Sequence, residues 1–149
     1  MRAVVQRVSD GMVRIDGASH GRIGVGLLVY LGVGRGDGDT DVQYLAEKVR
    51  HLRVFQDEAG HMNLDVKQAG GSVLVISAFT VQADARRGRR PSFEDAEQPD
   101  RAAVLYEMFC DELIALGVPV QKGVFGAMMD VVSTNAGPIC ILLESRRAF

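Results

Sequence analysis

Cysteine is scarce in this chain, with only Cys110 and Cys140 among its 149 residues. Small domains that depend on disulfides carry many more cysteines. A chain of this length buries roughly 68–70% of the surface that its unfolded form exposes, which is enough to hold a core without cross-links. We therefore expect a single domain over residues 1–149, with free thiols and a reducing compartment.

Long hydrophobic runs are also missing. The apolar stretches are far shorter than the roughly 20 residues that a membrane-spanning helix requires. The first residues, Met1–Arg7, contain no apolar core of the kind that a secretory signal has. These observations lead us to expect a cytoplasmic protein without a membrane partner.

The chain contains none of the short motifs that hold metals or nucleotides. His20, His51 and His61 have no paired spacing with one another or with the cysteines, whereas a metal site needs several converging ligands. The glycines that begin at Gly32 do not complete a G-x-G-x-x-G pattern, because its third glycine would fall at Asp37. We therefore expect no metal and no cofactor.

The net charge of −2 does not indicate nucleic-acid binding by the chain as a whole. One segment differs, because it places four arginines within five residues: Arg86, Arg87, Arg89 and Arg90. Such a block is compatible with an ordinary solvated loop. It is also suited to phosphate binding, since guanidinium groups match phosphate oxygens. The residues alone leave both interpretations open.

Hydrophobic periodicity and turn residues predict a mixed α/β domain in which strands outnumber helices. Thr40 and Gln43 indicate a capping box at the start of a first helix, and a second helix is expected over residues 100–116. Residues 82–99 form a long polar connection of a kind that is often functional. Strands are expected at residues 3–8 and 12–16, with a turn at Asp10–Gly11 between them, within 20–33, and at 53–56, 72–81, 118–121, 127–134 and 138–144.

Two short segments each adjoin a run of strand-forming residues: Ser77-Ala78-Phe79-Thr80-Val81 and Asn135-Ala136-Gly137-Pro138-Ile139-Cys140. The side chains of Ser77, Thr80 and Cys140 could attack a carbonyl, but a hydroxyl needs an adjacent base and no motif supplies one. A Gly-Pro bond is usually trans, since only about 5–6% of X-Pro bonds in folded proteins are cis. The residues of each segment alone assign no activity.

Taken together, in this order and at this separation, the two segments resemble the signature of the D-aminoacyl-tRNA deacylases. The resemblance continues in matching order along nearly the whole chain. Its further stretches are Met1–Val8, Gly26–Val33, Arg50–Phe55, Met62–Asp65, Gly88–Phe93 and Gly123–Met129.

The resemblance implies an α/β fold with largely antiparallel sheets, a barrel-like core and two main helices. It implies an obligate homodimer with active sites at the interface, acting on aminoacylated tRNA. The reaction would release D-amino acids, and glycine mischarged onto tRNA-Ala, by hydrolysis of the ester to the terminal ribose. A backbone wall at Gly137–Pro138, with its peptide bond cis, would reject L-amino acids by steric clash.

The family's site residues are carried over position by position. The resemblance implies catalytic roles for Ser77, Phe79, Thr80, Gly137 and Pro138, with the N–H groups of Phe79 and Thr80 as an oxyanion hole. It implies that the substrate is positioned by Arg7, Ala78, Phe125, Met129, Asn135 and Ala136. Arg7 corresponds to the arginine that holds the Gly-Pro element. For Arg86, Arg87, Arg89 and Arg90 it favours contact with acceptor-stem phosphates.

Two residues depart from the family pattern within the signature segments. Ala78 stands where the family usually has glutamine, and Cys140 where it usually has threonine. Two alternatives to an editing hydrolase follow. A divergent paralogue, non-catalytic or retargeted, would bind tRNA without deacylating it. A hydrolase that used the Cys140 thiol would lose activity on Cys140→Ser.

Overall fold

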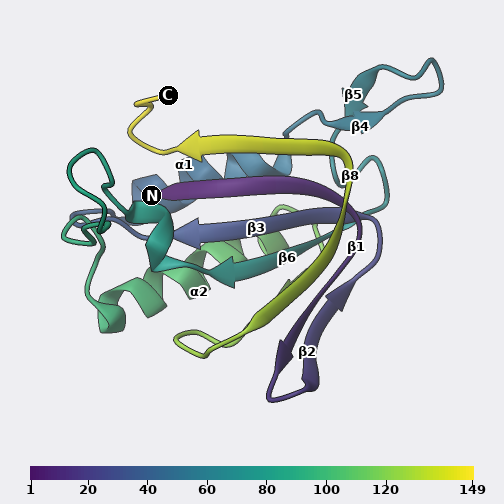
Figure 1. The fold of residues 1–149 in the computed structure, drawn as a ribbon. Coiled ribbons are helices and arrows are strands. Elements are labelled where there is room, and N and C mark those ends of the chain that lie inside the picture. The colour runs from purple at the N-terminus through teal and green to yellow at the C-terminus, as the bar shows by residue number, and fades with distance from the viewer.

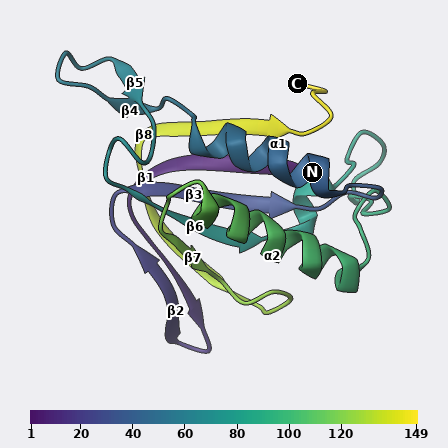
Figure 2. The ribbon, with the colours of Figure 1, turned by 180° about the vertical axis from the view of Figure 1, so that it is seen from behind.

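The computed structural model describes residues 1–149 and shows a strongly curved sheet with both helices packed on one face (Figures 1 and 2). This confirms the predicted mixed α/β class and the barrel-like core with two main helices. The elements are β1 (Arg2–Ile15), β2 (Ala18–Ile23), β3 (Gly26–Gly32), α1 (Asp39–Arg50), β4 (Phe55–Gln56), β5 (Met62–Leu64), β6 (Ser72–Ser77), the 3-10 helix η1 (Phe79–Gln82), α2 (Pro99–Ala115), β7 (Val120–Lys122) and β8 (Asp130–Glu144).

The main sheet has the order β2-β1-β3-β6-β7, and β8 pairs with β1. β1 is antiparallel to β2, β3 and β8, whereas β3, β6 and β7 run parallel to one another. β1 is long enough to serve two neighbours on one side: its first half pairs with β3 and its second half with β2. Because β8 follows β1 along nearly its whole length, both strands bend together and give the sheet its curvature (Figure 1).

β3 lies between two hydrophobic clusters, as its continuous apolar sequence predicts. Leu27, Val29 and Leu31 face the helices and belong to a core of 23 buried residues. Leu28 faces the concave side and joins a smaller cluster of six. The two helices contribute to the larger cluster from the apolar stripes that their sequences show, which include Val42, Leu45, Ala46, Val49, Leu105, Phe109 and Leu113.

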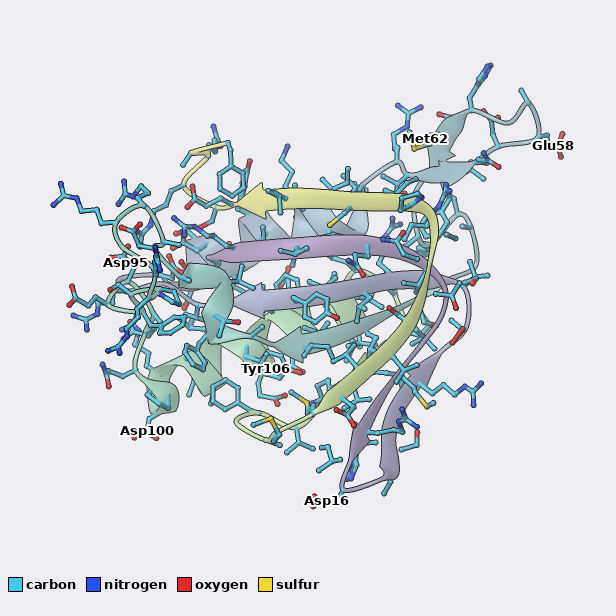
Figure 3. All side chains as sticks on the ribbon, in the orientation of Figure 1. Asp16, Glu58, Met62, Asp95, Asp100 and Tyr106 are labelled. Atoms are coloured by element: carbon cyan, nitrogen blue, oxygen red, sulfur yellow. The ribbon has the colours of Figure 1, made fainter.

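The expected turn at Asp10–Gly11 is wrong, because β1 runs unbroken through both residues. Gly11 pairs with β2 and β8 at once, and a Cβ there would meet Leu74 Cδ2 at 3.6 Å, an ordinary van der Waals distance. Pairing with both strands therefore keeps the chain extended at this position. The hairpin turn is at Asp16–Gly17, where both residues have positive φ (50° and 79°); Asp16 marks its tip in Figure 3.

Three other boundaries differ from the sequence prediction. The first helix begins at Asp39, and the N–H of its N-cap residue Gly38 donates to the Asp41 carboxylate (2.9 Å), in place of the capping box expected from Thr40 and Gln43. The strand expected over 72–81 ends at Ser77, because the chain turns into η1. The two strands expected at 127–134 and 138–144 form one strand, β8, which continues through Gly137–Pro138.

Candidate active site

The two signature segments lie at opposite ends of the sheet. Along the shared register, Ser77 is level with Leu31 and Ala3, whereas residues 136–139 lie beside Arg7. Ala3 and Arg7 are four residues apart on β1, or roughly 13 Å, and three strand spacings separate β8 from β6, or about 14 Å. Figure 1 shows the bend of β8 at one end and the carboxyl end of β6 at the other. One chain therefore does not bring the predicted catalytic residues together.

At the first end, hydrogen bonds of the backbone fix the segment that follows β6. The Ala78 N–H donates to Leu31 O (2.9 Å), and the Ala83 N–H donates to Thr80 O (3.1 Å). The buried Gln82 side chain adds a bond from its Nε2 to Gly32 O (2.7 Å). Phe79 and Thr80 are exposed at the first positions of η1, where N–H groups have no partner within the helix.

The side chain at position 78 makes none of these bonds. Ala78 contributes its N–H to Leu31 O and its carbonyl to the N–H of Val81 (3.1 Å), so both contacts are independent of the residue type. The departure from glutamine at this position therefore leaves the backbone of the segment in place.

Phe125 and Met129 lie close to the same end. The Phe125 ring contacts Tyr106 at a centroid distance of 5.8 Å, and the Tyr106 hydroxyl donates to Val75 O (2.8 Å) on β6. Figure 3 shows Tyr106 beneath this part of the sheet. Met129 packs over Gly123, next to the Ile76 side chain that precedes Ser77.

At the opposite end, side chains fix the element formed by residues 135–139. The Ile139 N–H donates to Asn135 Oδ1 (2.8 Å), and Arg7 Nε donates to Ala136 O (2.9 Å). The Gly137–Pro138 peptide bond is cis, and both residues are exposed at the bend. Asn135, Ala136 and Arg7 therefore hold a bare stretch of backbone in a fixed position.

Arg7 also ties this element to the segment that precedes β4. Its Nη1 donates to Val54 O (2.7 Å), so one guanidinium bridges two carbonyls that are far apart in sequence. A pocket of about 160 Å³ lies here, lined by Arg7, Val8, Ser9, Val25, Phe55, Gln56 and Ala136. The β4–β5 hairpin projects beside it, with Glu58 and Met62 far from the body of the molecule in Figure 3.

The arginine segment is a closed loop with its charges at the tip. Asp84 and Ser92 exchange two backbone hydrogen bonds of 2.8 Å, which close residues 84–92. Arg86 is committed to Asp84 through bonds of 2.9 and 2.6 Å, and this pairing holds the pKa of the Asp84 carboxyl well below its ordinary value. All four arginines are exposed, and Arg87, Arg89 and Arg90 have no ion pair within the chain.

The candidate nucleophiles have no histidine beside them. His20 lies on β2, His51 caps α1 and His61 lies between β4 and β5. Burial raises the pKa of the Cys110 thiol to about 12, so this cysteine belongs to the core. Cys140 is exposed on β8 opposite Gln6, at a distance from Ser77 along the strands.

No group of three or more His, Cys, Asp or Glu side chains is arranged to hold a metal ion. No helix is long and apolar enough to span a membrane.

Sequence reasoning missed three residues at these two ends. Gln82 anchors η1, Val54 supplies the second carbonyl to Arg7, and the exposed Phe93 ring contacts Phe79 with a centroid distance of 5.1 Å. Phe93 lies inside a stretch that resembles the family, but only the fold shows which residue it meets.

The profile of the D-Tyr-tRNA(Tyr) deacylase family matches residues 4–144. The chain belongs to this family. It is 55% identical over 149 residues to a D-aminoacyl-tRNA deacylase of Anaeromyxobacter dehalogenans, and the match covers all of both chains. It is 48% identical over 146 residues to the D-aminoacyl-tRNA deacylase of Aquifex aeolicus, which covers 98% of this chain and 99% of that one.

Two solved structures have the same fold as this deacylase-family chain. One is a c-Myc DNA unwinding element binding protein, with a TM-score of 0.93, 35% identity, and coverage of 97% of this chain and 98% of that one. The other is a probable eukaryotic D-amino acid tRNA deacylase, with a TM-score of 0.80, 15% identity, and coverage of 96% and 98%. At 15% identity the second likeness concerns the fold alone.

Proposed function

We propose that the protein hydrolyses the ester that joins a D-amino acid, or glycine, to the terminal ribose of tRNA, at two sites that two copies of the chain build together. The observation that carries the proposal is the separation of Ser77–Thr80 from Gly137–Pro138 along and across one sheet. A two-fold axis would place each Gly137–Pro138 element against the Ser77–Thr80 segment of the other copy, because an isologous interface repeats every contact.

The concave face of the sheet supports a second copy as its occupant. Tyr30, Cys140 and Leu142 lie on this face, and Leu142 is 57% exposed although it is a large apolar residue. Burial raises the pKa of the half-buried Tyr30 hydroxyl, and the nearby Cys140 adds to this effect. This face is continuous with the exposed Gly137–Pro138 bend. Docking of a second copy would therefore cover the face and insert the bend into the other copy's site.

The oxyanion that forms on the ester carbonyl would be stabilised by the N–H groups of Phe79 and Thr80. Both stand at the start of η1, free of partners within that helix. Preorganised backbone donors of this kind need no reorganisation during the reaction. The attacking group would be water, activated with help from the ribose 2′-OH, which fits a site without a histidine beside Ser77 or Thr80.

The preference for D-amino acids would come from the backbone at Gly137–Pro138. A pocket shaped for one side chain would select one amino acid, whereas a wall next to the substrate Cα rejects every L-side chain by the same clash. Arg7 and Asn135 hold that backbone in place through hydrogen bonds. The clash rejects L-amino acids only if the backbone cannot shift to relieve it. A D-side chain would point outward, and glycine has no side chain to clash.

The tRNA would be held in part by the tip of the 84–92 loop. Arg87, Arg89 and Arg90 are exposed there, and the loop lies at the same end of the molecule as η1. The Asp84–Ser92 bridge begins two residues after η1, so a phosphate backbone on the arginines would approach the proposed oxyanion hole.

The reaction is tested by charging one tRNA in turn with D-Tyr, L-Tyr and Gly, and following the ester with EDTA present. We expect rapid loss of the D-Tyr and Gly esters and a stable L-Tyr ester. If all three esters survive while the tRNA still binds, the protein is a non-catalytic paralogue and the proposal is wrong.

The shared site is tested by complementation between two damaged chains. Phe79→Pro removes one N–H at the first end, and Gly137→Ala disturbs the other end. Co-expression of the two variants should restore about a quarter of the wild-type sites, since half of the dimers would be mixed and each would have one intact site. If mass measurement verifies that mixed dimers have formed, and the co-expressed variants are as inactive as each variant alone, the whole site lies in one chain.

A further inference from the structure

Two phenylalanine rings near the carboxyl end of β6 are exposed. The Phe79 side chain is 57% exposed and that of Phe93 is 37% exposed, whereas Phe55 and Phe109 are buried. The rings meet edge to face, at a centroid distance of 5.1 Å and an interplanar angle of 71°. In this geometry the edge of one ring covers one face of the other, and the exposure of both residues leaves further ring surface open to solvent.

Phe93 is held firmly although it lies in a long connection. Its neighbour Ser92 exchanges two hydrogen bonds of 2.8 Å with Asp84, and Phe93 O accepts the N–H of Ala96 (3.1 Å). Ala96 in turn forms a bridge with Gly34, two residues after the end of β3. The backbone is therefore fixed on both sides of the ring, which makes the ring a preformed surface.

The surface lies between the proposed reaction centre and the arginines. Phe79 carries one of the proposed oxyanion donors, Phe93 contacts its ring, and the loop that Asp84 and Ser92 close leads on to the arginine tip. Figure 1 shows this loop projecting at the same end as η1, and Asp95 marks that end in Figure 3. Aromatic faces beside arginines are the usual means by which proteins hold unpaired nucleic-acid strands.

We propose that Phe93 stacks against the base of the nucleotide that precedes the terminal one at the 3′ end of the substrate RNA; this inference rests on the proposed function. The terminal nucleotide carries the ester and therefore lies at Phe79. The strand then runs toward the arginine tip and passes over Phe93. Phe93 is a positioning residue: it holds the strand so that the ester reaches the N–H groups of Phe79 and Thr80, and it does not touch the reacting bond.

The test uses a binding probe that cannot react, an RNA minihelix whose unpaired 3′ end is joined to D-tyrosine through an amide. Phe93→Leu keeps an apolar side chain without an aromatic face, and Phe93→Tyr keeps the ring. We expect Phe93→Leu to weaken binding about tenfold, and Phe93→Tyr to bind within about twofold of the wild type. Thermal unfolding of both variants shows whether the fold is intact.

Two further probes identify the base. When the base next to the terminal one is removed, we expect the wild type and Phe93→Leu to bind equally well; when the terminal base is removed instead, the difference should persist. A difference that persists on the first of these probes would mean that Phe93 acts only by packing against Phe79, and would overturn the inference. A difference between wild type and Phe93→Leu that disappears only when the terminal base is removed would also overturn the inference.

Failure of the inference is distinguishable from failure of the proposed function. If the wild type hydrolyses D-Tyr-tRNA and Phe93→Leu binds the probe as tightly as the wild type does, the stacking role alone is wrong. If the wild type leaves D-Tyr-tRNA intact, the proposed function is wrong, whatever the probes show.

Discussion

The two ends of the sheet hold their functional backbone in different ways. At the carboxyl end of β6, main-chain bonds from Ala78 to Leu31 and from Ala83 to Thr80 fix the segment, and only Gln82 adds a side chain. At the bend of β8, the bonds come from the side chains of Arg7 and Asn135. The first end is therefore insensitive to many substitutions, whereas the second depends on particular residues.

The difference accounts for one of the two departures from the family pattern, that at Ala78. Ala78 lies in the segment that the backbone holds, and its side chain takes part in none of the bonds. Arg7 and Asn135, which match the pattern, supply the bonds at the other end. Because a backbone carbonyl or N–H survives a change of side chain, a site can lose a glutamine at one end and keep its geometry.

The largest effect on kcat is expected from a substitution of Gly137. It tests whether the site tolerates a displacement of the backbone at the bend of β8. Gly137 has a φ of 146°, and a Cβ there would lie 2.9 Å from Ile139 Cγ1 and 3.0 Å from Ile139 N. Gly137→Ala should lower kcat for D-Tyr-tRNA about 10²-fold, since small displacements of positioning groups have effects of this size. Single-turnover deacylation measures it.

Gly60 provides a matched control for that substitution. It also has a positive φ (81°), but nothing lies within 4 Å of a Cβ there, and it belongs to the distant β4–β5 turn. Gly60→Ala should carry a similar backbone strain and leave kcat nearly unchanged. Comparable losses in both variants would show that general strain is responsible.

A smaller effect is expected from Arg7→Lys, which separates the charge of Arg7 from its geometry. A lysine keeps the charge but cannot bridge Ala136 O and Val54 O with a planar fork. Since a hydrogen bond from a charged group contributes roughly 1.5–3 kcal/mol, we expect kcat/KM to fall at least about tenfold. Arg14→Lys, on the exposed part of the same strand, should have no such effect; equal losses would assign the effect to β1 as a whole.

Local patterns predicted the elements that are built from apolar periodicity, and missed features that depend on distant partners. The β3 strand and the stripe from Val42 to Val49 were predicted correctly, because burial alone determines them. The pair Asp10–Gly11 favours a turn on local grounds. Two neighbouring strands, β2 and β8, keep it extended, and neither is visible in the local sequence.

The site was predicted from resemblance more than from physical pattern. Ser77–Thr80 and Gly137–Pro138 were identified as a pair, but no periodicity predicts that they lie at opposite ends of one sheet. That arrangement follows from the pairing of β1 with both β3 and β8. Likewise, the arginine block was visible in the sequence, whereas the ion pair that occupies Arg86 depends on the Asp84–Ser92 bridge.

The smallest effect is expected at the two residues that depart from the family pattern. Ala78→Gln and Cys140→Ser should each change kcat/KM for D-Tyr-tRNA by less than about twofold, in the range of ordinary surface substitutions. Ala78 contributes only backbone atoms, and Cys140 lies opposite Gln6 on β8, where its sulfur contacts the Gln6 amide at 3.9 Å. A large loss on Cys140→Ser, with the fold intact, would instead favour a hydrolase that uses this thiol. A large gain on Ala78→Gln would show that the first end does depend on a side chain, and the contrast between the two ends would then be one of degree.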